Sequence, residues 1–249
     1  EFAFGPYPVI FRATNLALTG ALIGGVYTTN SRGGFVTLIA ILFFYPLLRL
    51  KKKQIAIIFG AIFALIGLVY FAPSRMTQIS TDEESAHIRT RLWGNAMDMF
   101  KKSPILGIGK GRFIEDDENW RHMMAHSNFM QNLGETGGIG IFVWIALIYF
   151  SIKGLLQTTK WKTLPGSKEE RMKSLARALM VSMFGFSVCT LFVTMDIDIF
   201  YLLLGLCAAA VNVSNREVKP FAMKFTFKDT RNILLIILAL LLFYHMYTG

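Results

Sequence analysis

Apolar runs long enough to cross a lipid bilayer alternate with polar connections along this chain. A hydrocarbon core of roughly 30 Å requires about 20 apolar residues in a helix. The pattern predicts seven such spans, at residues 11–30, 33–50, 54–72, 137–156, 175–194, 197–214 and 232–248. A mostly polar stretch, Pro73 to Glu135, interrupts them. The pattern therefore predicts an all-α integral membrane protein with one large loop outside the bilayer.

Composition agrees with this pattern. The chain has 249 residues, 53% of them apolar, and a mean hydropathy of +0.46, which is too apolar for a soluble domain. The predicted division is N-terminal helices at 1–72, a polar loop at 73–135 and C-terminal helices at 136–249. The chain begins at Glu1 with no signal-peptide pattern, and we expect it to be part of a longer protein.

The net charge of +10 predicts an orientation in the membrane rather than binding to nucleic acid. Basic residues gather between apolar runs, in the clusters Arg49–Lys53, Lys153–Lys173 and Arg216–Arg231. Such clusters mark the cytoplasmic side of a membrane protein. Alternation of the spans then places the large loop and Arg32 on the outer side. An arginine at that boundary either extends to the lipid headgroups or binds an anion.

The polar loop begins with a predicted amphipathic helix. Thr81 and Glu84 fit a capping box, and Ser103-Pro104 disfavours continuation, so a helix is expected at about 82–102. One face of it carries Arg89, Trp93, Ala96 and Phe100. We expect this helix to lie on the membrane surface.

The rest of the loop concentrates groups that could act on a substrate. Besides Arg89, it carries Arg91, Arg112, Arg121, His122 and His126. The glycine-rich segment 104–111 lacks the strand and helix of a nucleotide-binding loop and is interpreted as a flexible turn. The two histidines are four residues apart, but no third ligand with suitable spacing accompanies them, so no metal site is predicted.

Four features together resemble the C-terminal half of the O-antigen ligase and O-antigen polymerase (Wzy_C-like) superfamily. Three are motifs: Ser31-Arg32-Gly33-Gly34-Phe35 opening a span, Arg89-x-x-x-Trp93 followed by FKKSPILGIG at 100–109, and HSNFMQNLGETGGIG at 126–140. The fourth is the large outer loop that carries the second and third motifs. Ser127 departs from the pattern, because many relatives have asparagine after the histidine.

The resemblance implies a bacterial inner-membrane enzyme of GT-C-like architecture, with its catalytic loop facing the periplasm. Such enzymes transfer glycans from undecaprenyl diphosphate. The favoured activity is O-antigen ligase, which transfers glycan to the lipid A core; the alternatives in the superfamily are a polymerase of O-antigen or exopolysaccharide and a protein O-oligosaccharyltransferase. The implied partners are the lipid-linked donor, the lipid A core or another glycan acceptor, and membrane lipids.

The chemistry of a lipid-diphosphate donor suggests roles for the motif residues. A diphosphate diester carries about two negative charges, which two guanidiniums can match in charge and geometry without a metal or another cofactor. We expect Arg32 and Arg89 to bind it, with Arg91 in reserve. A neutral imidazole can accept the proton of the acceptor hydroxyl, so His126 is the expected general base of an inverting transfer. The expected supporting residues are Trp93, Asn128 and Glu135.

Two other classes of protein would use the basic loop differently. A transporter of lipid-linked glycan would use it only to gather anionic substrate, and a membrane scaffold would not need these residues at all. Ionisable residues within the predicted spans are scarce, which does not favour a translocation pathway.

Overall fold

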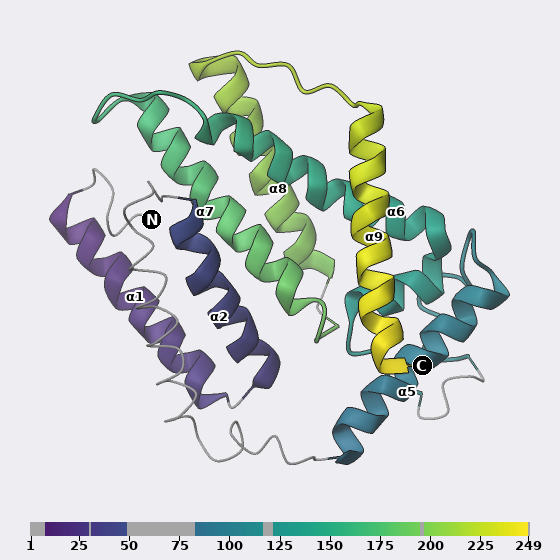
Figure 1. Ribbon diagram of the computed structural model, residues 1–249. Coiled ribbons are helices and arrows are strands. Elements are labelled where there is room, and N and C mark those ends of the chain that lie inside the picture. The colour runs from purple at the N-terminus through teal and green to yellow at the C-terminus, as the bar shows by residue number, and fades with distance from the viewer. Residues whose placement is uncertain (1–7, 30, 49–82, 117–121, 195–196, 249) are drawn as a thin grey trace. The chain divides into compact units, whose positions relative to one another are not determined.

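The computed structural model describes residues 8–29, 31–48, 83–116, 122–194 and 197–248. Within these ranges every regular element is helical (Figure 1), as predicted. The elements are α1 (Val9–Thr28), α2 (Arg32–Leu47), α5 (Glu83–Lys102), α6 (Asn128–Thr159), α7 (Lys168–Cys189), α8 (Ile197–Val213), the π-helical turn η2 (Ser214–Val218) and α9 (Phe227–Thr248). The predicted span at 54–72 and the capping residue Thr81 lie outside the described residues.

The described helices include several that are suited to a bilayer. Four helical segments are long and apolar enough to cross one: α1, α6, α7 and the segment Asp198–Val218, which joins α8 to η2. The helix α2 contains a shorter apolar stretch, Gly33–Tyr45. The helix α9 covers the predicted span at 232–248 without being one of the four. The chain is thus a multi-pass α-helical membrane protein, and the number of seven spans stays a prediction.

The chain forms two units, each assembled from separate segments. Unit 1 comprises Glu1–Ile79, Ser151–Cys189 and Phe200–Ala222. Within it α2 packs along α7, where the rings of Phe44 and Phe184 stack with centroids 4.1 Å apart. Gly185 has no side chain, which leaves room for Ile41 of α2. Small residues permit this kind of close approach between helices in a membrane.

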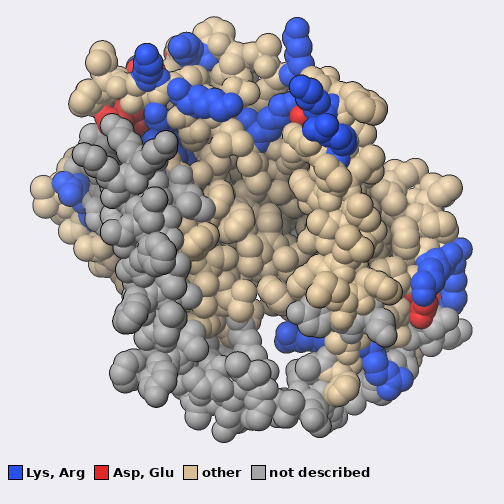
Figure 2. Space-filling model, viewed as in Figure 1, with Lys and Arg blue, Asp and Glu red and all other residues tan. Residues whose placement is uncertain are grey.

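One end of unit 1 is basic. Figure 2 shows Lys and Arg side chains gathered at the upper left of the view, over the connection between α6 and α7. There, Lys173 Nζ donates a hydrogen bond to the Trp161 carbonyl at 2.7 Å, and the Trp161 ring contacts Phe221. This is one of the clusters from which a cytoplasmic side is predicted.

Unit 2 contains all of the predicted site residues except Arg32. It comprises Ser80–Phe150, Thr190–Ile199 and Met223–Gly249, so it contains α5, the first part of α6 and all of α9. Apolar side chains from these helices and from the connection before α6 form its core. The largest fully buried ones are Leu92, Met99, Phe113, Phe129, Met130, Leu133, Ile141, Ile233 and Tyr244.

The first turn of α9 is tied to α6 by polar contacts. Thr226 caps the helix: its backbone N–H and its hydroxyl both donate to Asp229 Oδ2, at 2.8 and 2.7 Å. The other oxygen of Asp229 accepts a hydrogen bond from the Tyr149 hydroxyl of α6 at 2.9 Å. Asn232 Nδ2 donates to that same hydroxyl at 3.1 Å. These bonds fix α9 beside α6 at a point far along the helix from its C-terminal end.

Candidate functional site

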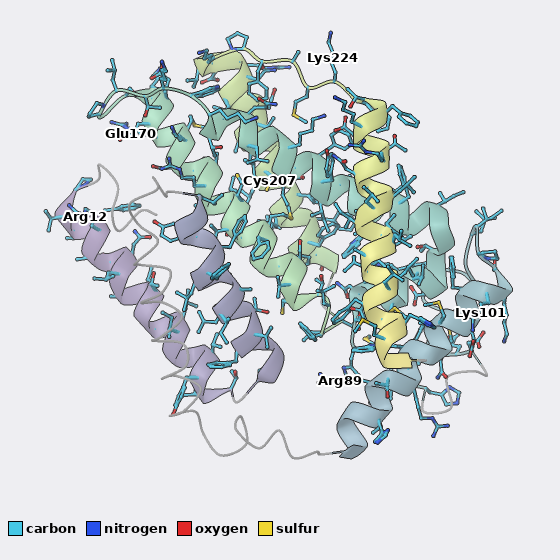
Figure 3. The ribbon with its side chains drawn as sticks, in the orientation of Figure 1. Arg12, Arg89, Lys101, Glu170, Cys207 and Lys224 are labelled. Atoms are coloured by element: carbon cyan, nitrogen blue, oxygen red, sulfur yellow. The ribbon has the colours of Figure 1, made fainter. Side chains whose placement is uncertain are left out.

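The helix α5 presents Arg89 at the edge of the core of unit 2. Leu92, Trp93, Ala96 and Met99 recur at helical spacing and are buried. Arg89 precedes Trp93 by about one turn and is half-buried, near the C-terminal end of α9 (Figure 3). The helix was therefore predicted with its ends nearly correct. Its apolar stripe packs against apolar side chains of α6 and α9, and a position on the membrane surface stays a prediction.

His126 lies in the connection before α6 and has left-handed backbone geometry. Its φ is 51°, which costs a residue with a side chain on the order of 1–2 kcal/mol. The neighbours on both sides hold this conformation. Trp93 Nε1 donates a hydrogen bond to the Ala125 carbonyl at 2.9 Å. Ser127 caps α6, since its Oγ accepts a hydrogen bond from the Met130 N–H at 3.3 Å.

The environment of His126 favours a neutral imidazole. Partial burial, and then the positive charge of Arg89, lower the pKa of His126 below its ordinary value of 6.5. Among the described residues, no carboxylate forms an ion pair with Arg89. The site therefore pairs an imidazole that can accept a proton with a guanidinium that can bind an anion.

The glycine-rich segment after α5 is bound to a kink in α6. At Gly137 the backbone of α6 leaves helical geometry, with φ 62° and ψ −161°. The kink frees backbone groups that pair with the segment 104–109. The four bonds are Ile108 N to Gly134 O at 3.0 Å, Gly109 N to Glu135 O at 2.9 Å, Gly138 N to Pro104 O at 2.8 Å and Ile139 N to Ile105 O at 3.2 Å. We call this pairing the kink clasp.

Two glycines make the kink clasp possible. A Cβ on Gly137 would lie 2.6 Å from the Gly107 nitrogen and the Ile105 carbonyl oxygen. A Cβ on Gly107, whose φ is 71°, would collide with the carbonyl of Glu135. The glycines thus serve close backbone approach. The expectation of a flexible turn is wrong in this respect, because the segment is hydrogen-bonded to α6.

Glu135, expected as a supporting residue, is a buried connector. Its side chain has no exposed surface, its Oε1 accepts a hydrogen bond from Gln131 Nε2 at 3.1 Å, and its Oε2 lies 2.8 Å from Lys110 Nζ. Gln131 Oε1 in turn accepts from the Thr194 hydroxyl at 3.4 Å. This chain of contacts joins the segment after α5, the first turns of α6 and the segment before α8.

The described residues show the surroundings of two of the three expected diphosphate-binding arginines. Arg89 lies beside His126, whereas Arg91 is exposed on α5, two positions further along the helix. Arg32 is the first residue of α2 in unit 1, and its side chain lies outside the described part of the structure. Its participation stays a prediction.

Asn128 and His122 also have defined places. The Asn128 N–H donates to the Thr190 carbonyl at 2.9 Å, which ties the start of α6 to the segment 190–199 of the same unit. His122 has a φ of 49°, and its Nδ1 lies 2.8 Å from the Ile114 carbonyl oxygen. The two histidines are therefore not on one helix face. In the described residues, no group of three His, Cys, Asp or Glu side chains could hold a metal ion.

One neighbour of the site escaped sequence reasoning altogether. The hydroxyl of Tyr244, on α9, lies 2.7 Å from Ser127 Oγ although the two residues are 117 positions apart. No local pattern marks such a contact. A tyrosine near the end of an apolar helix is otherwise typical of the membrane interface.

Comparison with known proteins identifies a family model that matches about half of the chain. The family model described as O-Antigen ligase (Wzy_C) matches residues 17–145, a range that contains the C-terminal part of α1, all of α2 and α5, and the first part of α6. No curated protein and no solved structure matches the chain.

Proposed function

Because the chain belongs to the O-antigen ligase family, whose members are glycosyltransferase-like membrane enzymes acting on lipid-linked glycans and acceptors, we propose that it transfers a glycan from undecaprenyl diphosphate. The acceptor proposed first is the lipid A core. The reaction takes place at the periplasmic face of the bacterial inner membrane. The single observation that supports this proposal best is the partly buried His126 beside Arg89, which forms no ion pair with a carboxylate among the described residues.

In the proposed reaction, the acceptor hydroxyl oxygen forms a bond to the anomeric carbon of the donor sugar. The bond from that carbon to the diphosphate oxygen breaks, and the electron pair leaves with the diphosphate. His126 takes the hydroxyl proton, which its lowered pKa permits at neutral pH. Attack opposite the leaving group inverts the anomeric centre.

The leaving diphosphate must be stabilised as its negative charge grows. Arg89 supplies one guanidinium, and Arg32 is proposed to supply the second from α2, with Arg91 in reserve. A guanidinium binds two phosphate oxygens at once, so the pair can match the charge of the diphosphate without a divalent cation. Trp93, Asn128 and Glu135 act indirectly, because their described contacts hold the backbone around the site.

The test is covalent transfer of radiolabelled glycan in proteoliposomes that contain the donor and lipid A core. His126→Ala should lower transfer at least about 100-fold, which is the usual contribution of a general base. The matched control is His122→Ala, because His122 has the same left-handed backbone in the same loop but is exposed; transfer should be nearly unchanged. Normal transfer by His126→Ala would contradict the proposed role.

The arginines are tested by conservative substitution. Arg89→Lys and Arg32→Lys keep the positive charge but lose the guanidinium that can bind two phosphate oxygens at once. Because a charge-assisted hydrogen bond contributes about 1.5–3 kcal/mol, loss of one such bond should lower turnover about 10- to 100-fold. Unchanged turnover in both variants counts against a diphosphate clamp. The product identifies the activity. Glycan on lipid A core indicates a ligase, longer lipid-linked chains indicate a polymerase, and movement without covalent attachment indicates a transporter.

A further inference from the structure

The aromatic ring of Tyr244 lies behind the loop that carries His126. Tyr244 is fully buried near the C-terminal end of α9. Its ring meets Trp93 edge to face, with centroids 4.8 Å apart, and stacks on Phe129 at 5.4 Å. Such aromatic pairs prefer these arrangements. One ring therefore contacts both α5 and the first turn of α6, on either side of His126 in the chain.

The hydroxyl of Tyr244 completes a directional series of hydrogen bonds. It donates to the Leu191 carbonyl at 2.9 Å. A hydroxyl has a single proton, so its contact with Ser127 Oγ at 2.7 Å must be a bond that Ser127 donates. Ser127 Oγ accepts in turn from the Met130 N–H. Every polar group in this buried series is thereby satisfied.

These contacts bear on the unfavourable backbone of His126. Its left-handed conformation persists only if the surroundings over-determine it. Ala125, on one side, is held by Trp93, and Ser127, on the other, is held by Tyr244. Tyr244 also packs against Trp93. Tyr244 thus reaches both anchors of the loop, Ser127 through its hydroxyl and Trp93 through its ring.

We infer that Tyr244 is a positioning residue, whose hydroxyl holds the backbone of residues 125–127 so that the imidazole of His126 stays beside Arg89. The inference rests on the proposed function of His126 as general base. Tyr244 itself is fully buried. Its effect is exerted through Ser127 and the loop, and it should appear in the chemical step rather than in binding of the donor.

The chain offers a matched control for this inference. Tyr149 also joins α9 to its surroundings through a hydroxyl with two hydrogen bonds, to Asp229 and from Asn232. That contact lies about 20 Å along α9 from Tyr244, at a rise of about 1.5 Å per residue. Tyr149→Phe and Tyr244→Phe each remove one hydroxyl and keep the ring. Both loosen α9 to a similar degree, but only the second acts beside His126.

The experiment measures glycan transfer by both variants in proteoliposomes, with the kcat and the KM for the lipid-linked donor determined separately. Tyr244→Phe should lower kcat about tenfold and change KM less than twofold, whereas Tyr149→Phe should leave both near the wild-type values. Equal loss in the two variants, or wild-type kcat in Tyr244→Phe, would overturn the inference. If Tyr244→Phe does not accumulate in the membrane, Ser127→Ala replaces it with the same expectation.

A second arm separates this inference from the proposed function. In a His126→Ala background, Tyr244→Phe should cause no further loss of the remaining transfer, because its effect acts through the imidazole. A further tenfold loss there indicates a general structural role and overturns the inference alone. If His126→Ala itself transfers glycan normally, the role of the base fails whatever Tyr244→Phe does.

Discussion

The kink clasp gives the sharpest prediction about stability. Gly137→Ala places a methyl group 2.6 Å from the Gly107 nitrogen and the Ile105 oxygen. The clasp would have to separate to admit it. The φ and ψ of Gly137 also lie in a region that is almost confined to glycine, at a cost of about 1–3 kcal/mol for other residues.

The magnitude follows from these two effects. The clasp contains four backbone hydrogen bonds, each with a net contribution of about 1 kcal/mol. Loss of about half of them together with the backbone strain destabilises the protein by about 3–5 kcal/mol. The control is Gly111→Ala in the same segment, since Gly111 also has positive φ but a Cβ there meets nothing within 4 Å. It should cost only about 1–2 kcal/mol.

The assay is thermal unfolding of the purified protein in detergent, followed by tryptophan fluorescence, because Trp93 is buried in the core of unit 2. At about 2–4 °C per kcal/mol, Gly137→Ala should unfold at least about 6 °C below the wild type. Gly111→Ala should remain closer to it. If Gly137→Ala unfolds at the same temperature as Gly111→Ala or above it, the close approach of the two segments is refuted.

Two further predictions concern charge. Because burial and Arg89 lower the pKa of His126, activity should persist below pH 6.5 and fall only as the pH drops through the lowered pKa. In a pH–rate profile, Arg89→Gln should move this fall to higher pH, because it removes the positive charge beside the imidazole. An unchanged profile would show that Arg89 and His126 do not interact. In the Lys110–Glu135 pair, Lys110→Met leaves a fully buried carboxylate without its cation, whereas Glu135→Gln leaves a half-exposed ammonium that water can solvate. Thermal unfolding should therefore show the larger loss for Lys110→Met, about 3 kcal/mol against about 1, and the reverse order would contradict the burial argument.

Local patterns in the sequence predicted the helices well. The helix α5 was expected at 82–102 and spans Glu83–Lys102, because a proline ends it and its apolar residues recur at helical spacing. The expected start of a span at 137 coincides with the kink at Gly137, and the histidine motif runs directly into α6.

Contacts between distant segments could not be predicted in the same way. The kink clasp joins residues about 30 positions apart in sequence, and backbone hydrogen bonds leave little trace in side-chain chemistry. The apolar stripe of α5 would look the same whether lipid or protein covered it. The partners of Glu135 and Ser127 likewise depend on how helices far apart in the chain pack.

The assembly of unit 2 from separate segments has a consequence for biosynthesis. Ser127 leaves the ribosome long before Tyr244, which follows 117 residues later. At roughly 5–20 residues per second, the delay is about 6–23 s. During that interval the nascent chain already contains the histidine motif but cannot yet form the contacts of the Tyr244 ring with Trp93 and Phe129. Folding of α9 is therefore the step that completes the loop, and chains released before it would carry the histidine motif without the contacts of Tyr244 that support it.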